Sequence, residues 1–574
     1  MGTIVGIDLG TTNSVVSYMK LGKPIIAENK GEKIIPSVVH IKKNGEVIVG
    51  TLAKRKLGDK SEEIISEIKR DMGTDKTRLI DDIEYSPQKI SSLILEELKE
   101  FSQVYIGEEI NEVVITVPAN FDNKQREATK EAARLAGLKV KKLISEPTAA
   151  ALAYGYDNID KEGNILVYDL GGGTFDVSIL ELNDRLFYVK STEGNMYLGG
   201  KDFDERLVDL VLEHIKNEMD IDLSDNEQAK AQMKEEAERV KKQLSYSEEE
   251  EYFIPSLRGV LDEFGMPICI ELKISRDKLE SLIANLIDKT EDLIDKSIKK
   301  ANIDYEDIDT VLPVGGSTKM PIVRNLLLRK FGDKVKFDLN PDEVVAQGAA
   351  ILGSIDGDEI EGVPNTNVTG ENPGTGIIID VCPFTLGVEI VAKENGALIP
   401  GKFDRIINKN TTIPTYKKEC YCTVKDNQEK VLIKVFQGED DFVENNIHIG
   451  TLEISDIPKA IAGEQEIEVK FIYEEDGTLD IETILLSTGA TVKSVFLKPD
   501  EVDLPEETKE LLKNASEAIS KTWPEKGKKV QEYIEKIKVA FKENNDESFK
   551  KYEKLLTEIV FEIIFTDMND GITK

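Results

Sequence analysis

Residues 164–182, NILVYDLGGGTFDVSILEL, constrain the fold more than any other stretch, because three consecutive glycines separate two apolar segments. The first segment is a continuous apolar run that ends at Asp169, and the second alternates apolar with polar residues. This pattern is typical of two strands joined by a tight turn. The glycines can adopt backbone conformations closed to other residues and let a ligand approach the main chain, while Thr174 adds a hydroxyl. The sequence therefore predicts a hairpin whose turn can bind phosphate.

A similar stretch, IVGIDLGTTNSVVSYM, occupies residues 4–19. Asp8 and Gly10 in this stretch correspond to Asp169 and Gly171 in the later one. We therefore expect two similar lobes that face one nucleotide.

Length and charge narrow the class of protein. A chain of 574 residues is too long for one hydrophobic core, so we expect three or four domains. With 74 basic and 109 acidic residues the net charge is −35, which argues against nucleic acid and anionic membranes as partners. The sequence shows no secretory signal pattern and no apolar run that could span a bilayer, so we expect a cytoplasmic protein.

The four cysteines are too few for a disulfide framework in a chain of this length. Cys420 and Cys422 stand two residues apart in a strand-like run and lack companions for a zinc site. We interpret this pair as structural.

Helical and strand patterns alternate in the first 355 residues, which indicates an α/β fold. We expect strands at 113–117 and 311–314, and helices at 62–72, 90–101, 123–136, 226–244 and 344–352. Several polar residues here can be either ordinary structural residues or parts of a functional site. In the structural interpretation, Lys69 is a solvated lysine and Glu146 caps a helix. Glu238, Lys241 and Ser245 share one helical face, as an ion pair on the surface would.

A different composition begins after residue 355. Residues 356–376 are mostly Gly, Pro, Asn, Thr and acidic, which is typical of a connector, and the apolar triplet 377–379 ends it. Short alternating strands follow at 388–391, 419–424, 431–436, 451–454, 466–473, 479–484 and 491–497, with a hairpin turn at Asp476 and Gly477. We infer a β-sandwich followed by about 75 helical residues that could cover it.

Three long motifs now support a family. IDLGTTNS at 7–14, VYDLGGGTFDVSI at 167–179 and VLPVGGSTKMP at 311–321 closely resemble the signature stretches of the seventy-kilodalton heat-shock chaperones, the DnaK family. The resemblance implies a multidomain protein: an α/β actin-like (ribonuclease H-like, duplicated) ATPase domain over 1–355, a linker over 356–380, an all-β sandwich that binds peptide over 381–498, and a short α-helical lid over 499–574. It also implies ATP or ADP with Mg²⁺ as ligands, and K⁺ as a further candidate ion.

The resemblance assigns roles to residues of the ATPase domain. It implies that Asp8 and Asp169 hold Mg²⁺ through water, and that Lys69, Glu146, Asp176 and Thr174 act in hydrolysis. The nucleotide would be bound by Gly10, Thr11, Thr12, Asn13, Gly171, Gly172, Gly173, Gly199, Gly200, Glu238, Lys241, Ser245, Gly315, Gly316, Ser317, Lys319 and Asp342. The phosphate site is not of the P-loop kind, because the sequence contains no G-x-x-x-x-G-K-[ST] stretch.

The resemblance also assigns a peptide cleft and an allosteric linker. Val388, Val391, Val424, Val431 and Ile433 match positions that line an apolar cleft, although without the resemblance these residues read as ordinary core. Ile377, Ile378, Ile379 and Asp380 match the linker that couples ATP to peptide affinity. The implied partners are unfolded polypeptides, a J-domain co-chaperone and a nucleotide-exchange factor.

Some features depart from the family pattern. Residues 392–405 look like an insertion beside the cleft, with Lys402 where an aliphatic residue is expected, and Lys319 replaces a common arginine. DVCPFTLG at 380–387 and the short lid are similar to the specialised HscC-type members. Two other functions remain open: a nucleotide-gated reactivating factor with little turnover, and a metabolite kinase on the actin-like fold.

Overall fold

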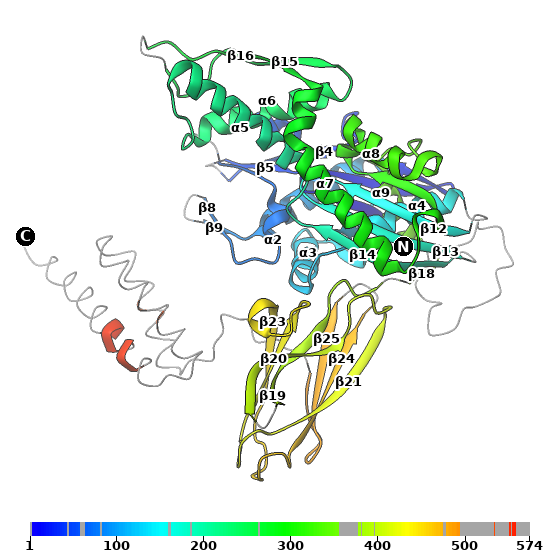
Figure 1. The fold of residues 1–574 in the computed structure, drawn as a ribbon, viewed down its shortest axis with the longest axis vertical. Coiled ribbons are helices and arrows are strands. Elements are labelled where there is room, and N and C mark those ends of the chain that lie inside the picture. The colour runs from blue at the N-terminus through cyan, green and yellow to red at the C-terminus, as the bar shows by residue number, and fades with distance from the viewer. Residues whose placement is uncertain are drawn as a thin grey trace, which may run out of the picture. The chain divides into compact units, whose positions relative to one another are not determined.

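The computed structural model describes residues 3–42, 45–57, 63–80, 83–158, 162–183, 186–261, 265–354, 377–379, 381–394, 397–474 and 478–493, with a few residues between 533 and 557. The predicted connector at 356–376, Asp380, the turn at 476–477 and nearly all of the predicted lid lie outside the described residues. The chain divides into two compact units (Figure 1). Unit 1 comprises 1–386, 405–418 and 470–480, and unit 2 comprises 387–404, 419–469 and 481–574.

Two large sheets with the same local arrangement form the centre of unit 1. The first has the order β11-β10-β1-β2-β3 and the second β17-β12-β13-β14-β18. In each, the strand before the glycine turn is antiparallel to the next strand and parallel to a third. The strands of the first sheet are β1 (Val5–Leu9), β2 (Asn13–Lys20), β3 (Lys23–Ile26), β10 (Glu112–Val117) and β11 (Lys139–Ser145), with β4 (Ile35–Pro36) paired to β2. Those of the second are β12 (Gly163–Leu170), β13 (Phe175–Asn183), β14 (Leu186–Asn195), β17 (Ile308–Val314) and β18 (Ile377–Ile379).

Helices α4 (Glu146–Asp157) and α9 (Val344–Ser354) pack against each other and against strands of both sheets. A Cβ atom at Gly348 would lie 1.8 Å from the carbonyl oxygen of Ala149, and one at Gly6 would lie 2.1 Å from the amide nitrogen of Ala350. These glycines therefore allow the helices to approach each other and β1 at backbone distance. The two duplicated halves are joined through this contact.

The other helices cover the two halves. α2 (Pro87–Ile106) and α3 (Asn123–Leu135) belong to the first half, and α7 (Arg276–Ala301) packs on β13 and β14 of the second. The remaining helices of unit 1 are α1 (Thr51–Lys54), α5 (Gly200–Met219), α6 (Glu227–Leu244) and α8 (Pro321–Phe331), with 3-10 turns η1 (Ile68–Asp71), η2 (Tyr305–Asp307), η3 (Gly316–Lys319) and η4 (Gly332–Lys334). Small sheets contain β5 (Val38–Ile41), β6 (Val47–Val49), β7 (Glu63–Ser66), β8 (Arg78–Ile80), β9 (Ile83–Tyr85), β15 (Glu249–Ile254) and β16 (Ile270–Ser275).

The helix predicted at 62–72 is wrong. Residues 63–66 form strand β7, which pairs with β5, and the 3-10 turn η1 follows. Glu67, between them, has a φ of 64°, which is outside the right-handed helical region. Isoleucines that share a helical face also suit a short strand, and pairing with β5 decides between the two.

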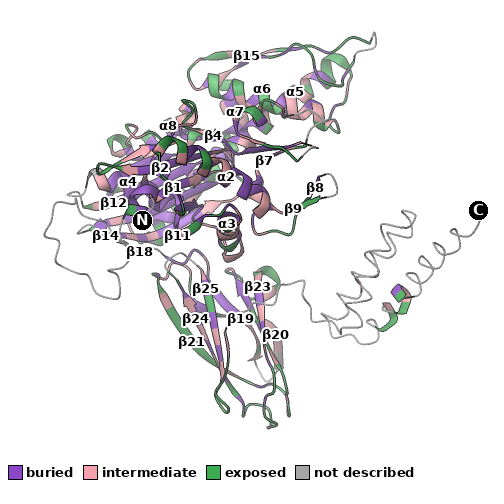
Figure 2. Cartoon of the chain, turned by 180° about the vertical axis from the view of Figure 1, so that it is seen from behind, coloured by how far each residue is buried: buried purple, intermediate pink, exposed green. Residues whose placement is uncertain are grey.

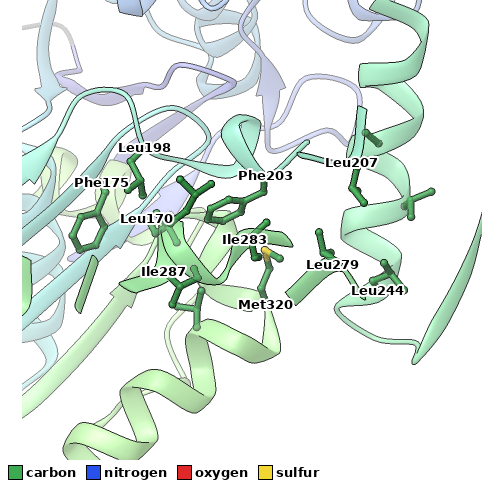
Figure 3. Close-up of a cluster of buried hydrophobic side chains, with 14 of the residues drawn as sticks. Leu170, Phe175, Leu198, Phe203, Leu207, Leu244, Leu279, Ile283, Ile287 and Met320 are labelled. Carbon is green, nitrogen blue, oxygen red and sulfur yellow. The ribbon is translucent and has the colours of Figure 1, made fainter. Parts of the chain in front are cut away.

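The glycine turn rests on a hydrophobic core. Figure 3 shows Leu170 and Phe175, the residues on either side of the turn, in a buried cluster with Phe203, Ile283 and Met320. All five side chains are buried, and Figure 2 shows the same burial along the central strands. The turn is therefore anchored at both ends by packed side chains.

Two four-stranded sheets occupy residues 386–493, with the orders β20-β19-β22-β23 and β21-β24-β25-β26. The strands are β19 (Leu386–Glu394), β20 (Ala397–Ile407), β21 (Thr415–Cys422), β22 (Val431–Gln437), β23 (Ile447–Ile454), β24 (Glu466–Tyr473), β25 (Leu479–Leu485) and β26 (Ala490–Lys493), with a 3-10 turn η6 (Val443–Asn445). Strand β24 alternates buried and less buried residues as predicted. The sequence did not predict β20, which with the end of β19 contains the described residues of the apparent insertion at 392–405.

Candidate functional site

A cavity of about 600 Å³ and a smaller one of about 90 Å³ adjoin each other in unit 1. Both linings contain residues from three segments. These are the turn after β1 (the first glycine turn: Thr11, Thr12 and Asn13), the turn after β12 (the second glycine turn: Gly172) and the chain after β17 (Gly316 and Asp342). The predicted nucleotide residues therefore surround one continuous site, although they come from distant parts of the chain.

The second glycine turn packs tightly against its surroundings. Gly171 N–H donates to the carbonyl of Thr174, and the Gly171 carbonyl accepts from Gly200 N–H at 3.0 Å. A Cβ at Gly172 would lie 1.9 Å from Thr12 Oγ1, so a larger residue has no room there. Thr12 Oγ1 is buried and has no hydrogen-bond partner within the described protein. This hydroxyl between the two turns is available to a bound ligand.

Four carboxylates and one lysine gather under the turns. Asp8 is the last residue but one of β1, Asp169 lies directly opposite Asp176 in the β12–β13 register, and Glu146 begins α4. Lys69 Nζ lies 2.5 Å from Glu146 Oε1. Lys69, Glu146, Asp169 and Asp176 are buried, whereas Asp8 is half-buried.

Burial and mutual repulsion act on these carboxylates. Burial, followed by the charge of Glu146, raises the pKa of Asp8 and that of Asp176 to about 7 each. The same two causes, in the same order, raise the pKa of Asp169 well above its ordinary value. Such a cluster carries more negative charge than Lys69 can balance, so the site suits a cation as well as the phosphates.

Neighbouring polar side chains hold the carboxylates in place, and the sequence analysis missed them. Thr116 Oγ1 donates to Asp8 at 3.1 Å, and Asn120 Nδ2 donates to Asp176 at 2.6 Å. Both residues lie at or after the end of β10, and the parallel pairing of β10 with β1 brings them to the site. The position just after a central parallel strand was the available signal.

Helix α6 supplies one wall of the larger cavity through Glu238, Lys241 and Ser245. Lys241 Nζ lies 2.7 Å from Asp204 and donates to the carbonyl of Gly200 at 2.6 Å. Burial works to raise the pKa of Glu238, but Lys54 and Lys242 lower it to about 2. The three predicted residues therefore do lie on one face, and ion pairs fix two of them.

The opposite wall follows β17. Gly315 has a φ of 80°, Ser317 Oγ donates to the carbonyl of Gly171 at 3.0 Å, and Lys319 Nζ lies 2.5 Å from Asp342. These contacts connect this wall directly to the phosphate turn.

Most predicted ATPase residues line one or both of the cavities. Gly173, Asp176 and Gly199 do not line either cavity. A Cβ atom would lie 2.7 Å from its nearest neighbour at Gly173 and 2.6 Å from its nearest neighbour at Gly199. Within the described residues, no three His, Cys, Asp or Glu side chains are close enough to ligate a metal directly.

The predicted peptide residues belong to unit 2 and differ in exposure. Val388 and Ile433 are buried, Val431 is half-buried, and Val391 and Val424 are 40% and 51% exposed. Tyr421 Oη donates to Asp404 at 2.7 Å, and Lys402 Nζ lies 4.5 Å from the centre of the Phe442 ring.

Among the helices of the described residues, none has the length and apolar character needed to cross a membrane.

Comparison with known proteins agrees with this geometry. A family model described as "Hsp70 protein" matches residues 4–563. "Chaperone protein DnaK" of Thermotoga neapolitana is 40% identical over 557 residues, which are 97% of this chain and 88% of the relative. The protein of the same name from Thermosipho melanesiensis is 42% identical over 488 residues, 85% of this chain and 78% of the relative. The chain therefore belongs to the Hsp70 family of ATP-dependent molecular chaperones.

Proposed function

We propose that this chain hydrolyses ATP in the cavities of unit 1 and uses the energy to change its affinity for extended apolar segments of unfolded polypeptides. The observation that carries the proposal is the meeting of both glycine turns, Lys69 and the buried carboxylates around one site. Phosphoryl transfer requires mainly positioning and positive charge on the phosphate oxygens, and this site offers both.

The residues around the smaller cavity divide the chemistry among them. Backbone N–H groups of the two turns, with the hydroxyls of Thr11, Thr12 and Thr174, bind the phosphates. Lys69 places its ammonium against the terminal phosphate and the attacking water. Glu146 and Asp176 accept hydrogen bonds from that water and orient it for in-line attack.

Asp8 and Asp169 suit Mg²⁺ held through water, because both are acids with raised pKa values that line the smaller cavity, each one residue before the end of its strand. When bound, Mg²⁺ supplies positive charge that neutralises phosphate oxygens. In the larger cavity, Glu238, Lys241 and Ser245 bind the adenosine end of the nucleotide from one side, and Gly315, Ser317 and Lys319 bind it from the other.

The sandwich supplies the second half of the function. Val391 and Val424 are exposed and can close over an extended peptide, while Val388, Val431 and Ile433 line the apolar surface beneath it. A main chain bound there by hydrogen bonds, with one or two aliphatic side chains in the pocket, favours unfolded segments over a unique sequence.

The domain boundaries predicted from the sequence, the helical lid and the resemblance to HscC-type members remain part of this proposal. So do a J-domain co-chaperone, a nucleotide-exchange factor, K⁺ binding and a cytoplasmic location.

The test compares ATP turnover with and without an extended apolar peptide in the parent and in Val431→Phe. We expect peptide to stimulate the parent several-fold and to leave Val431→Phe unaffected, because a phenyl ring fills the pocket. Stimulation that survives Val431→Phe would reject the cleft. Phosphate transfer to a sugar would reject the chaperone in favour of a kinase, and absent turnover with intact nucleotide binding would favour a reactivating factor.

A further inference from the structure

Two ion pairs connect the halves of unit 1 on either side of Lys69. Lys201 Nζ, at the start of α5, lies 2.5 Å from Glu67 Oε1, and Arg70 Nη2 lies 3.1 Å from Asp202 Oδ2. Glu67 and Arg70 belong to the first half and lie two residues before and one residue after Lys69, whereas Lys201 and Asp202 belong to the second half. The turn that presents Lys69 is therefore held from the opposite side of the site.

One residue of each ion pair also donates a hydrogen bond to the phosphate turn. Lys201 N–H donates to the carbonyl of Gly172 at 2.9 Å, and Arg70 Nη2 donates to the carbonyl of Gly173 at 2.8 Å. Displacing either pair would thus disturb both the lysine and the turn that faces it.

The Glu67–Lys201 pair has features of a positioning contact rather than an incidental surface pair. Glu67 adopts a left-handed backbone conformation, which is unfavourable for a residue with a Cβ and persists only where surrounding contacts enforce it. The Lys201 side chain is only 21% exposed, and burial lowers its pKa despite the opposing charge of Glu67. Removing Glu67 would leave the Lys201 charge without its partner in a poorly solvated place.

We propose that Glu67 and Lys201 are positioning residues that hold Lys69 over the phosphate turn when the two halves are closed. The pair acts through the backbone of η1, in which Lys69 is the second residue. Neither Glu67 nor Lys201 takes part in the chemical step. This inference rests on the proposed ATPase function and adds two residues to it.

The experiment measures single-turnover hydrolysis of preformed ATP complexes and ATP affinity in Glu67→Gln, Lys201→Met and the double variant. We expect each single variant to slow hydrolysis about tenfold while ATP affinity changes less than about threefold. The double variant should hydrolyse ATP no more slowly than a single variant, because both substitutions remove the same ion pair. Lys201→Arg keeps the charge, and the contact with Glu67 is a single ion pair rather than a bidentate or stacked one, so this variant should stay within about threefold of the parent.

A matched control uses the same helix. Lys216 pairs with Asp222 at 2.9 Å near the other end of α5, with both side chains more than half exposed. Lys216→Met should hydrolyse ATP at the parent rate. The exchanged pair, Glu67→Lys with Lys201→Glu, should recover most of the loss, which a purely steric role would not allow.

Hydrogen exchange of amides 63–72 provides a readout that does not depend on turnover. We expect exchange there to rise at least fivefold in Lys201→Met and to stay unchanged in Lys216→Met. Variants that exchange and hydrolyse like the parent would overturn the proposal. A parent that protects this segment but does not hydrolyse ATP would reject the proposed function and leave the positioning pair standing.

Discussion

At the scale of single residues, the phosphate site is a balance of charges that no single motif reveals. Lys69 is the one cation within hydrogen-bonding distance of Glu146 among the described residues, yet three aspartates share its surroundings. The sequence alone favoured a solvated lysine, because the contact that buries it comes from a residue 77 positions away. The long motifs located the turns, whereas Thr116, Asn120 and Asp204 became visible only once the strands and helices were assembled.

Lys69→Ala should separate binding from hydrolysis. We expect turnover to fall by roughly 10²–10³, because a positioned charge on the phosphate oxygens is lost. Nucleotide affinity should change much less, since the adenosine walls and backbone N–H groups remain. Single-turnover hydrolysis and equilibrium binding of a fluorescent ATP analogue measure the two quantities. Turnover within threefold of the parent would contradict the assigned role of Lys69.

Glu238 should make stability depend on pH. Its folded pKa of about 2 lies below the ordinary value of 4.5, so its contribution to stability is complete above about pH 4.5 and declines as pH falls toward 2. Glu238→Gln should lower the free energy of unfolding by about 2–3 kcal/mol at pH 7 and by less than half as much near pH 3. Urea denaturation at both pH values tests this, with the exposed Glu213→Gln as control. An equal loss at both values would mean that packing, rather than charge, is responsible.

At the scale of elements, the sequence predicts strands and helices well where periodicity is long or a motif fixes the turn. Strand β24 has the bounds that the sequence predicts, because its apolar residues alternate with polar ones and the apolar residues are the buried ones. Residues 62–72 were misread because Ile64 and Ile65 suit a short strand and, together with Ile68, also suit one face of a helix, and only pairing with β5 decides between the two. Strand β20 was missed because Pro400 and Gly401 interrupt it, and a sequence pattern does not show the partner that extends it.

The crossing of α4 and α9 should tolerate no side chain at Gly348. Gly348→Val places methyl groups where the Ala149 carbonyl oxygen lies, so we expect a loss of at least about 3 kcal/mol in stability or failure to fold. Gln347→Val, one residue earlier on the same helix and only half-buried, should cost less than about 1 kcal/mol. Thermal unfolding followed by circular dichroism compares them. Equal melting temperatures for the two variants would show that α9 can shift without cost.

At the scale of the whole molecule, unit 1 combines a duplicated pair of sheets with one strand from a distant part of the sequence. Strand β18 pairs in parallel with the edge strand β14, with Ile377 opposite Leu186 and Ile379 opposite Tyr188. β14 also pairs with β13, which begins at the phosphate turn. A single continuous sheet therefore connects the predicted linker to the nucleotide site. We propose that a shift between the halves changes the affinity of this edge for β18.

Replacing Ile378 and Ile379 together by Asp should uncouple the two activities. Aspartate is depleted in strands, and charged residues weaken pairing at a sheet edge, so β18 should no longer pair with β14. We expect basal ATP turnover to remain within about threefold of the parent, since β18 pairs with the edge strand β14 and not with the described strands that flank the phosphate turn, and we expect peptide stimulation to disappear. Because typical coupling free energies are about 1–3 kcal/mol, the difference in peptide lifetime between the ATP and ADP states should shrink by roughly 5- to 150-fold. Peptide binding to the ADP state should persist, which separates a lost connection from a damaged sandwich. If peptide stimulated the double variant as strongly as the parent, communication would have to pass through a route other than this strand.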